Sequence, residues 1–214
     1  MTMRPALDLR VYLVTDRNCL RDKTLEEALE EALAAGVTLV QYRDKDTSGG
    51  DMYRRALRLK EICRKHGVPL LVNDRLDVAL AVGADGVHLG QSDLPVAEAR
   101  RLAGPDFIIG ATAHNVEEAR RAEAEGADYL GCGAVFASGT KHDTVPLGLD
   151  GLAAISRAVE IPLVGIGGVT AETYPDVLAT GADGAAVVNG ILGQEDITAA
   201  VKAFLACAKE KGTV

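Results

Sequence analysis

The amino-acid sequence predicts an α/β fold, a single (β/α)8 barrel in which helices surround a closed parallel sheet, taking up residues 1–214. Two observations predict this class. Short apolar runs typical of buried strands alternate with amphipathic helical patterns along the whole chain, which indicates a parallel sheet. The strand–helix units number eight, as in a closed barrel. An open, doubly wound sheet built from the same units is the alternative.

The expected elements alternate strictly along the chain. Strands are expected at residues 11–15, 37–41, 68–72, 86–89, 107–111, 129–132, 161–166 and 184–188. Helices are expected at residues 25–35, 50–66, 75–82, 95–102, 116–125, 149–159, 171–179 and 197–211. Thr24 and Glu27 have the spacing of a capping box at the start of the first helix. Gly36, Gly83, Gly126 and Gly181 follow helices where a positive φ is favoured, and a buried strand begins soon after each.

Composition narrows the classes of function. A chain of 214 residues can bury a full hydrophobic core without disulfides. The net charge of −8 argues against a nucleic acid or an anionic membrane as a partner. The four cysteines lack metal-ligand spacing, and no apolar run approaches the length of a membrane span. We therefore expect a cytoplasmic protein with reduced thiols, and the sequence leaves its oligomeric state open, a homo-oligomer included.

Polar and charged residues gather where the predicted strands end, and barrels of this kind carry their active sites at that rim. The opposite ends carry mostly glycine, alanine and proline. The rim residues are Gln41, Arg43 and Lys45 after the second strand, Asn73 and Asp74 after the third, Gln91 and Asp93 after the fourth, Thr112 and His114 after the fifth, Ser138, Thr140 and Lys141 after the sixth, Gly167 and Gly168 after the seventh, and Asn189 and Gly190 after the eighth.

Asp74 and Asp93 close two successive strands, so in a parallel sheet they lie close enough to share a divalent cation such as Mg²⁺. Either residue alone also suits the N-cap of the following helix. The presence of Arg43, Lys45 and Lys141 on the same rim favours a binding site. With Mg²⁺ bound, this set carries a net charge of about +3, which matches a diphosphate ester of about −3. The residues therefore indicate a clamp for a diphosphate leaving group.

The loops after the seventh and eighth strands, VGIGGV and VVNGI, predict a second anion site. Their small residues leave backbone N–H groups for a monophosphate. Two anion sites on one rim imply two phosphorylated small-molecule substrates. No nucleophile with an adjacent base is evident, so we expect positioning and electrostatics to supply the catalysis.

Each rim residue also has an ordinary role open to it. The three cations suit solvated loop positions. His88 and His114 are expected to be hydrogen-bonded structural residues rather than metal ligands, and Cys132 is expected to lie in the core. Only the coincidence of cations and carboxylates at one rim favours a functional site.

The sequence resembles the thiamin phosphate synthase family over nearly its whole length. The resemblance rests on VYLVTD, GVTLVQYRDK, LLVNDRLDVALAVGADGVHLGQSDLP, IIGATAHNVEEA, GADYLGCGAVFASGTK, IPLVGIGGV and GADGAAVVNGI, in this order. It implies a (β/α)8 barrel that joins a hydroxymethylpyrimidine diphosphate to a thiazole phosphate, forming thiamin phosphate and releasing diphosphate. It also implies a dissociative mechanism, in which diphosphate leaves before the thiazole nitrogen captures the pyrimidine methylene cation.

The resemblance implies a role for each matching residue. Arg43, Lys45 and Lys141 are the implied catalytic cations, and Asp74 and Asp93 the implied Mg²⁺ ligands. Thr112, Ser138 and Asn189 stand where Ser, Thr and Ser are usual, and each keeps a hydrogen-bonding side chain. The implied pyrimidine diphosphate residues are Gln41, Arg43, Lys45, Asn73, Thr112 and Lys141, and the implied thiazole phosphate residues are Ser138, Thr140, Gly168, Val188 and Asn189.

Two other functions remain open from the sequence. A thiazole tautomerase of the same barrel family would use His114 as its acid–base group, but it would have no use for the diphosphate clamp. A non-catalytic protein that binds thiamin phosphates would not need the metal ligands. A phosphopentose epimerase would need paired His and Asp metal ligands, which the sequence lacks.

Overall fold

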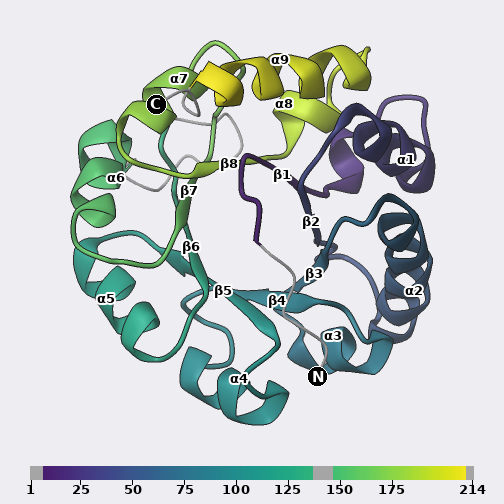
Figure 1. Cartoon of the computed structure of the whole chain (residues 1–214). Coiled ribbons are helices and arrows are strands. Elements are labelled where there is room, and N and C mark those ends of the chain that lie inside the picture. The colour runs from purple at the N-terminus through teal and green to yellow at the C-terminus, as the bar shows by residue number, and fades with distance from the viewer. Residues whose placement is uncertain (1–6, 137–146, 211–214) are drawn as a thin grey trace.

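A computed structural model of the chain describes residues 7–136 and 147–210. Eight parallel strands form a closed barrel in the order of the sequence, with helices around the outside (Figure 1). The barrel closes where β1 pairs with β8, with Val11 opposite Ala185. The predicted (β/α)8 fold is confirmed, and the open-sheet alternative is wrong because both edge strands are paired.

The strands are short and the helices surround them. The strands are β1 (Val11–Val14), β2 (Leu39–Tyr42), β3 (Leu70–Asn73), β4 (Gly86–Leu89), β5 (Ile108–Ala113), β6 (Tyr129–Gly133), β7 (Leu163–Ile166) and β8 (Gly184–Val187). The helices are α1 (Leu25–Ala35), α2 (Gly49–His66), α3 (Leu76–Val82), α4 (Val96–Ala103), α5 (Val116–Ala124), α6 (Gly148–Ser156), α7 (Tyr174–Ala179), α8 (Asn189–Leu192) and α9 (Ile197–Glu210).

Most differences from the sequence prediction lie at element ends. The capping box of Thr24 and Glu27 is present, and the four predicted glycines all have positive φ. Two short elements were not predicted: a 3-10 helix at Arg17–Cys19 and helix α8 directly after β8. Both have only three or four residues, too few to show a helical repeat in the sequence.

Side-chain alternation along the strands produces two separate apolar regions. In β1, Val11 and Leu13 pack outward against the helices, whereas Tyr12 and Val14 belong to a smaller cluster that fills the barrel. Successive side chains on a strand point to opposite faces, so one strand supplies both regions. Each fully buried side chain of this size contributes about 1.5–3 kcal/mol of transfer free energy.

The same alternation directs four polar side chains into the barrel. Gln41, Asn73, His88 and Thr112 stand an even number of residues after the inward-facing Leu39, Leu71, Gly86 and Ile108 of their own strands. Gln41, Asn73 and His88 are each less than a tenth exposed. The four residues lie at or near the carboxyl ends of adjacent strands, which places polar groups at one end of an otherwise apolar interior.

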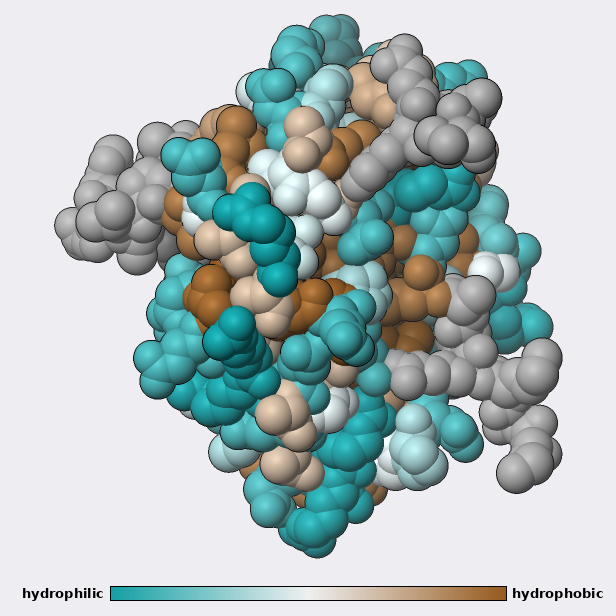
Figure 2. Space-filling model, turned by 60° about the vertical axis from the view of Figure 1, so that its left-hand side comes forward, coloured by the Kyte–Doolittle hydropathy of each residue, from teal (hydrophilic) through white to brown (hydrophobic). Residues whose placement is uncertain are grey.

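One face of the molecule shows hydrophilic side chains with apolar ones scattered among them (Figure 2). Cys132 is fully buried, as expected, and the cysteines are free thiols. Within residues 7–136 and 147–210, none of the helices combines the length and apolar character needed to cross a membrane.

Candidate active site

Two of the predicted cations, Arg43 and Lys45, follow β2 and line a pocket of about 270 Å³. Arg43 Nη1 lies 3.4 Å from Asp16 Oδ2 in the loop after β1. Lys45 Nζ lies 3.9 Å from Asp74 Oδ2 in the loop after β3. The Lys45 side chain is 59% exposed, so its ammonium group is accessible to a ligand. The pocket is lined by the cations Arg17, Arg43 and Lys45 together with the carboxylates of Asp16, Asp44 and Asp46.

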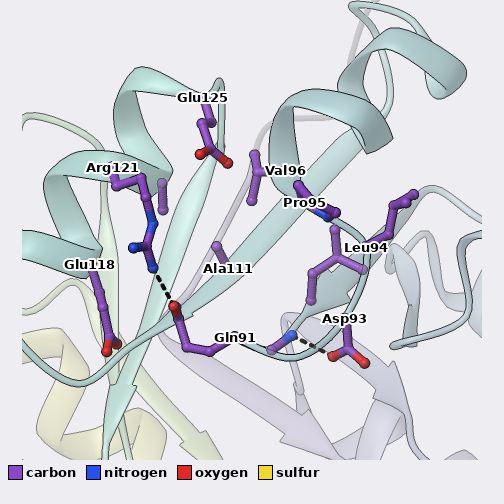
Figure 3. A pocket seen from close by; sticks show the side chains of 12 residues that line it. Gln91, Asp93, Leu94, Pro95, Val96, Ala111, Glu118, Arg121 and Glu125 are labelled. Carbon is purple, nitrogen blue, oxygen red and sulfur yellow. Dashed lines mark hydrogen bonds between the residues drawn. The ribbon is translucent and has the colours of Figure 1, made fainter.

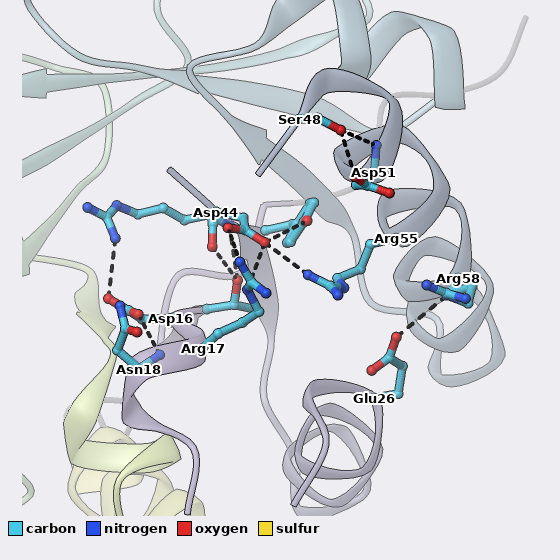
Figure 4. Close-up of polar contacts among 12 residues, drawn as sticks. Asp16, Arg17, Asn18, Glu26, Asp44, Ser48, Asp51, Arg55 and Arg58 are labelled. Atoms are coloured by element: carbon cyan, nitrogen blue, oxygen red, sulfur yellow. Dashed lines mark hydrogen bonds and ion pairs between the residues drawn. The ribbon is translucent and has the colours of Figure 1, made fainter. Parts of the chain in front are cut away.

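Asp44, between these two cations in the sequence, is the buried anchor of their loop (Figure 4). Its carboxylate lies 2.9 Å from Arg17 Nε and 3.0 Å from Arg55 Nη1, and it accepts a hydrogen bond from the Tyr42 hydroxyl. Burial, followed by the charge of Asp44, raises the pKa of Tyr42 to about 12. These contacts hold the loop in place, and its cations Arg43 and Lys45 line the pocket.

Asp74 has an unusual backbone conformation, with a positive φ of 63°. Its backbone N–H donates to the carbonyl of His88 on the next strand, at 2.8 Å. The left-handed region is uncommon for a side-chain-bearing residue, although aspartate and asparagine tolerate it best. Asp74 is not a helix cap, because Arg75 holds the N-cap position of α3 and makes no side-chain capping bond. The capping interpretation of Asp74 is therefore wrong.

Asp93 also differs from the capping interpretation, because Pro95 holds the N-cap position of α4. Asp93 Oδ2 instead accepts a hydrogen bond from Gly90 N at 2.7 Å, within the loop after β4 (Figure 3). The Asp93 carboxylate interacts directly with that of Asp74. Burial, then a hydrogen bond between the Asp74 and Asp93 side chains and the charge of Asp93, raise the pKa of Asp74 to about 6. The loops thus bring two carboxyl groups together, as the sequence predicted.

The predicted polar residues Gln41, Asn73 and Thr112 all lie at this end of the barrel. Gln41 donates to the Tyr12 hydroxyl, and Thr112 Oγ1 lies 3.0 Å from His88 Nε2. Asn73 pairs in register with His88 across β3 and β4. The three side chains therefore come from β2, β3 and β5, at the same end of the barrel as the cations after β2 and the carboxylates after β3 and β4.

The loops of the predicted monophosphate site are adjacent because β7 pairs with β8. Gly167 and Gly168 have φ values of 94° and 66°, so only glycine fits this turn without strain. Val188 precedes α8 and makes no side-chain capping bond, and Asn189 begins that helix. The predicted residues Ser138, Thr140 and Lys141 lie outside the described residues.

His88 and His114 are both hydrogen-bonded, as expected. His88 is buried between Tyr129 and Thr112, and burial lowers its pKa to about 4. His114 is half exposed and its Nδ1 lies 2.9 Å from Glu118 Oε2. Among the described residues, no group of three or more His, Cys, Asp or Glu side chains is arranged to hold a metal ion.

Asp16 and Asp44 were missed by the sequence analysis. Asp16 directly follows the first predicted strand, so its position carried the same signal as those of the other rim residues. Asp44 had a weaker signal, an acidic residue between two basic ones. Its importance depends on Arg17 and Arg55, which come from other elements.

A second pocket of about 290 Å³ lies beside the loop after β4, between α4 and α5 (Figure 3). Arg121 of α5 donates to Gln91 Oε1 at 2.5 Å, and Gln91 Nε2 donates to the Thr112 carbonyl at 2.5 Å. These bonds connect the outer helix to the strand end that carries Thr112. The pocket shares Asp93 with the rim but contains neither Arg43 nor Lys45.

The fold and the rim together define a (β/α)8 barrel with cationic and acidic side chains at the carboxyl ends of its strands, where enzymes of this fold carry their active sites. The family model described as thiamine monophosphate synthase matches residues 11–191. A thiamine-phosphate synthase of Clostridium beijerinckii is 48% identical over 200 residues, covering 94% of this chain and 96% of that protein. One of Chloroflexus aurantiacus is 48% identical over 215 residues, covering 99% of each.

A solved structure gives the same assignment. The thiamine phosphate pyrophosphorylase of Pyrococcus furiosus superimposes with a TM-score of 0.88 at 41% identity, covering 95% of this chain and 96% of that one. The chain therefore belongs to the thiamine monophosphate synthase family. The resemblance seen in the sequence motifs is confirmed.

Proposed function

We propose that this enzyme is the transferase that joins 4-amino-2-methyl-5-hydroxymethylpyrimidine diphosphate to a thiazole phosphate, giving thiamin phosphate and diphosphate in thiamin biosynthesis. The observation that carries the proposal is the rim itself. Lys45 Nζ lies 3.9 Å from Asp74, and both Arg43 and Asp93 influence the same carboxyl group. A site of alternating cations and carboxylates suits a diphosphate with a divalent metal, and the family relationship supports that substrate.

The donor set fits a magnesium ion. Mg²⁺ prefers oxygen ligands and typically takes one or two carboxylates, with phosphate oxygens and water completing its shell. Asp74 and Asp93 supply two carboxylates, and burial together with the neighbouring Asp93 carboxylate raises the pKa of Asp74. Asp74 and Asp93 would hold the ion, which would neutralise negative charge on the diphosphate oxygens as the ester bond breaks.

The protein residues would act on the leaving group by electrostatics. Arg43 and Lys45 would bind diphosphate oxygens and stabilise the charge that accumulates there, and Lys141 is proposed to join them. The C–O bond of the pyrimidine methylene group breaks and diphosphate leaves with the electron pair. The nitrogen lone pair of the thiazole then forms the new C–N bond. This sequence needs no protein nucleophile and no proton transfer at the reacting carbon.

The second substrate would bind through its phosphate. The backbone turn of Gly168 and the start of α8, at Val188 and Asn189, offer small residues and N–H groups next to the rim. Ser138 and Thr140 are proposed to add hydroxyl groups. The two anion sites would then hold the two substrates with their reacting atoms together, which is a large part of the rate enhancement in such reactions.

One assay tests this function. The protein is incubated with both substrates and Mg²⁺, and diphosphate and thiamin phosphate are measured over time. Equal amounts of the two products are expected. Tautomerisation of a thiazole phosphate without diphosphate release would instead support the tautomerase, and binding of thiamin phosphates with no turnover would support the non-catalytic protein. Three points are separate from this assay: a cytoplasmic location, a homo-oligomeric state, and whether the thiazole acceptor carries a carboxylate.

A further inference from the structure

Five polar side chains form a continuous line of hydrogen bonds through the interior of the barrel. Gln41 Nε2 donates to the Tyr12 hydroxyl, which lies 2.7 Å from the Tyr129 hydroxyl. Tyr129 Oη lies 2.8 Å from His88 Nδ1, and His88 Nε2 lies 3.0 Å from Thr112 Oγ1. The line therefore joins Gln41 on β2 to Thr112 on β5, two residues of the proposed pyrimidine site.

The three middle side chains of this line are buried away from water. Tyr12 is 1% exposed, Tyr129 0% and His88 8%. Tyr12 and Tyr129 belong to the apolar cluster that fills the barrel, and their rings meet edge to face. An unpaired donor or acceptor is costly at such depth, so each proton in the line needs an acceptor.

This requirement fixes the direction of the hydrogen bonds. The Tyr12 oxygen accepts from Gln41, so the Tyr12 proton must go to Tyr129, its other partner among the described residues. The Tyr129 proton must then go to His88 Nδ1. His88 in turn carries its proton on Nε2 and donates it to Thr112 Oγ1. Every bond in the line thus runs from Gln41 toward Thr112.

We propose that Tyr12, Tyr129 and His88 are positioning residues that set the hydrogen-bond polarity of the pyrimidine site. Thr112 accepts from His88, so its hydroxyl proton is directed to a ligand. Gln41 uses one amide N–H to bond Tyr12, and its carbonyl oxygen is left to accept from a ligand. The site presents a donor at one side and an acceptor at the other, which matches a ring bearing both an amino group and a ring nitrogen. This inference rests on the proposed function for the identity of that ring.

The backbone of Thr112 is held separately from its side chain. Its carbonyl accepts from Gln91 Nε2 at 2.5 Å, and Gln91 is itself bonded to Arg121 of α5 (Figure 3). The strand end is therefore fixed from outside the barrel, and the buried line determines only where the hydroxyl proton points. A change in the line is expected to alter ligand binding without moving β5.

The first test measures the tautomer of His88 in the ligand-free protein. Long-range ¹H–¹⁵N correlation spectra of ¹⁵N-histidine-labelled protein report which ring nitrogen carries the proton, and His88→Gln assigns the signal. We expect His88 as the Nε2–H tautomer in the unmodified protein and a mixture of tautomers in Tyr129→Phe. A wild-type His88 with its proton on Nδ1, or a tautomer that Tyr129→Phe leaves unchanged, would overturn the proposal.

The second test separates positioning from stability. Tyr129→Phe is expected to raise KM for the pyrimidine diphosphate about tenfold, the cost of about one misdirected hydrogen bond, and to change KM for the thiazole phosphate less than about twofold. Tyr174→Phe is the matched control, since Tyr174 is equally buried but donates to the Arg10 carbonyl outside this line. We expect its kinetic constants to equal those of the unmodified enzyme.

A double variant tests whether Tyr129 acts through Thr112. Thr112→Val removes the hydroxyl at the end of the line, so adding Tyr129→Phe to it should raise KM by less than it does alone. Independent, fully multiplicative effects would overturn the proposal. The tautomer spectra need no substrate, so an inactive wild-type protein with the expected tautomer would contradict the proposed function while leaving the polarity of the line established.

Discussion

Lys45 Nζ lies 3.9 Å from Asp74 Oδ2, although the two residues follow different strands, β2 and β3. The pair joins the cationic and acidic halves of the rim. Both side chains are partly exposed, so the ion pair itself adds little stability. Its importance is positional. A diphosphate arriving with Mg²⁺ supplies new partners for both groups, phosphate oxygens for Lys45 and the metal for Asp74.

Asp93→Asn is expected to lower Mg²⁺-dependent turnover by about 100-fold or more while keeping the fold. The variant retains a side-chain oxygen that can accept from Gly90 N, so the loop after β4 keeps its hydrogen bond. It loses the negative charge that a magnesium ligand needs. Steady-state rates across a range of Mg²⁺ concentrations, together with circular dichroism, measure both expectations.

The matched control for this variant is Asp77→Asn. Asp77 is an exposed carboxylate on α3 that pairs with Arg75 and does not line the pocket of Arg43 and Lys45. Its substitution removes the same charge and is expected to leave turnover within about twofold of the unmodified rate. An Asp93→Asn enzyme that turned over at the rate of this control would refute the metal assignment.

The metal-free protein is expected to lose stability as the pH rises through about 6, because of Asp74. Burial and Asp93 raise the pKa of Asp74 from its ordinary 3.8 to about 6. The folded protein therefore holds this proton more tightly than the unfolded chain does. The resulting stabilisation is complete below pH 3.8 and is lost as the carboxyl ionises near pH 6. The Asp74 side chain is 28% exposed, so solvent screening limits the effect to about 1 kcal/mol, or about 2–4 °C in Tm.

Thermal melts in EDTA between pH 4 and pH 8 test this expectation against Asp74→Asn. Asparagine tolerates the positive φ of this position and cannot titrate. The difference in Tm between the two proteins isolates the Asp74 carboxyl from every group they share. At pH 7, Mg²⁺ should raise the Tm of the unmodified protein and leave that of Asp74→Asn nearly unchanged. Parallel curves for the two proteins would show that Asp74 has no raised pKa.

Asp44→Ala is expected to lower the free energy of unfolding by about 3 kcal/mol, since it leaves two guanidinium groups without their buried partner. Asp44 contacts Arg17 at 2.9 Å and Arg55 at 3.0 Å, and its side chain is only 3% exposed. The loop that carries Arg43 and Lys45 should loosen, so KM for the pyrimidine diphosphate should rise as well. Urea unfolding and steady-state kinetics measure the two effects. Asp46→Ala, an exposed position in the same loop, should leave the free energy of unfolding unchanged.

The fold and the rim could be predicted from the sequence because both depend on local patterns. Alternating strands and helices define the barrel, and the residue after each strand lies at the rim whatever the details of packing. The pairing of Asp74 with Asp93 followed in this way. The capping interpretation of both residues was wrong because Asp74 turns into the left-handed region and Asp93 binds Gly90. Neither turn has a strong sequence signature.

The supporting contacts could not be predicted, because they join residues from distant strands. Nothing near Tyr12 in the sequence indicates that its hydroxyl meets that of Tyr129. The meeting depends on the inward alternation of both strands and on the closure of the barrel. Asp44 depends in the same way on Arg17 and Arg55. Residues that would contact substrate were therefore easier to find than those that orient them.

Gly110→Ala tests whether Tyr129 can keep its position only when residue 110 has no side chain. A Cβ at Gly110 would overlap the ring and hydroxyl of Tyr129, so this side chain would have to move away from Tyr12 and His88. Overpacking of this kind costs about 1–3 kcal/mol, and we expect a fall in Tm of at least about 4 °C.

Gly50→Ala is the control. Its nearest neighbours are the end of the flexible Arg54 side chain, at 3.7 Å, so it should be neutral or slightly stabilising. Tyr129→Leu should restore part of the lost stability of Gly110→Ala by removing the overlapping ring atoms. An unchanged Tm in Gly110→Ala would mean that the barrel interior has room for Tyr129 to shift, and the tight placement of its hydroxyl would then be wrong.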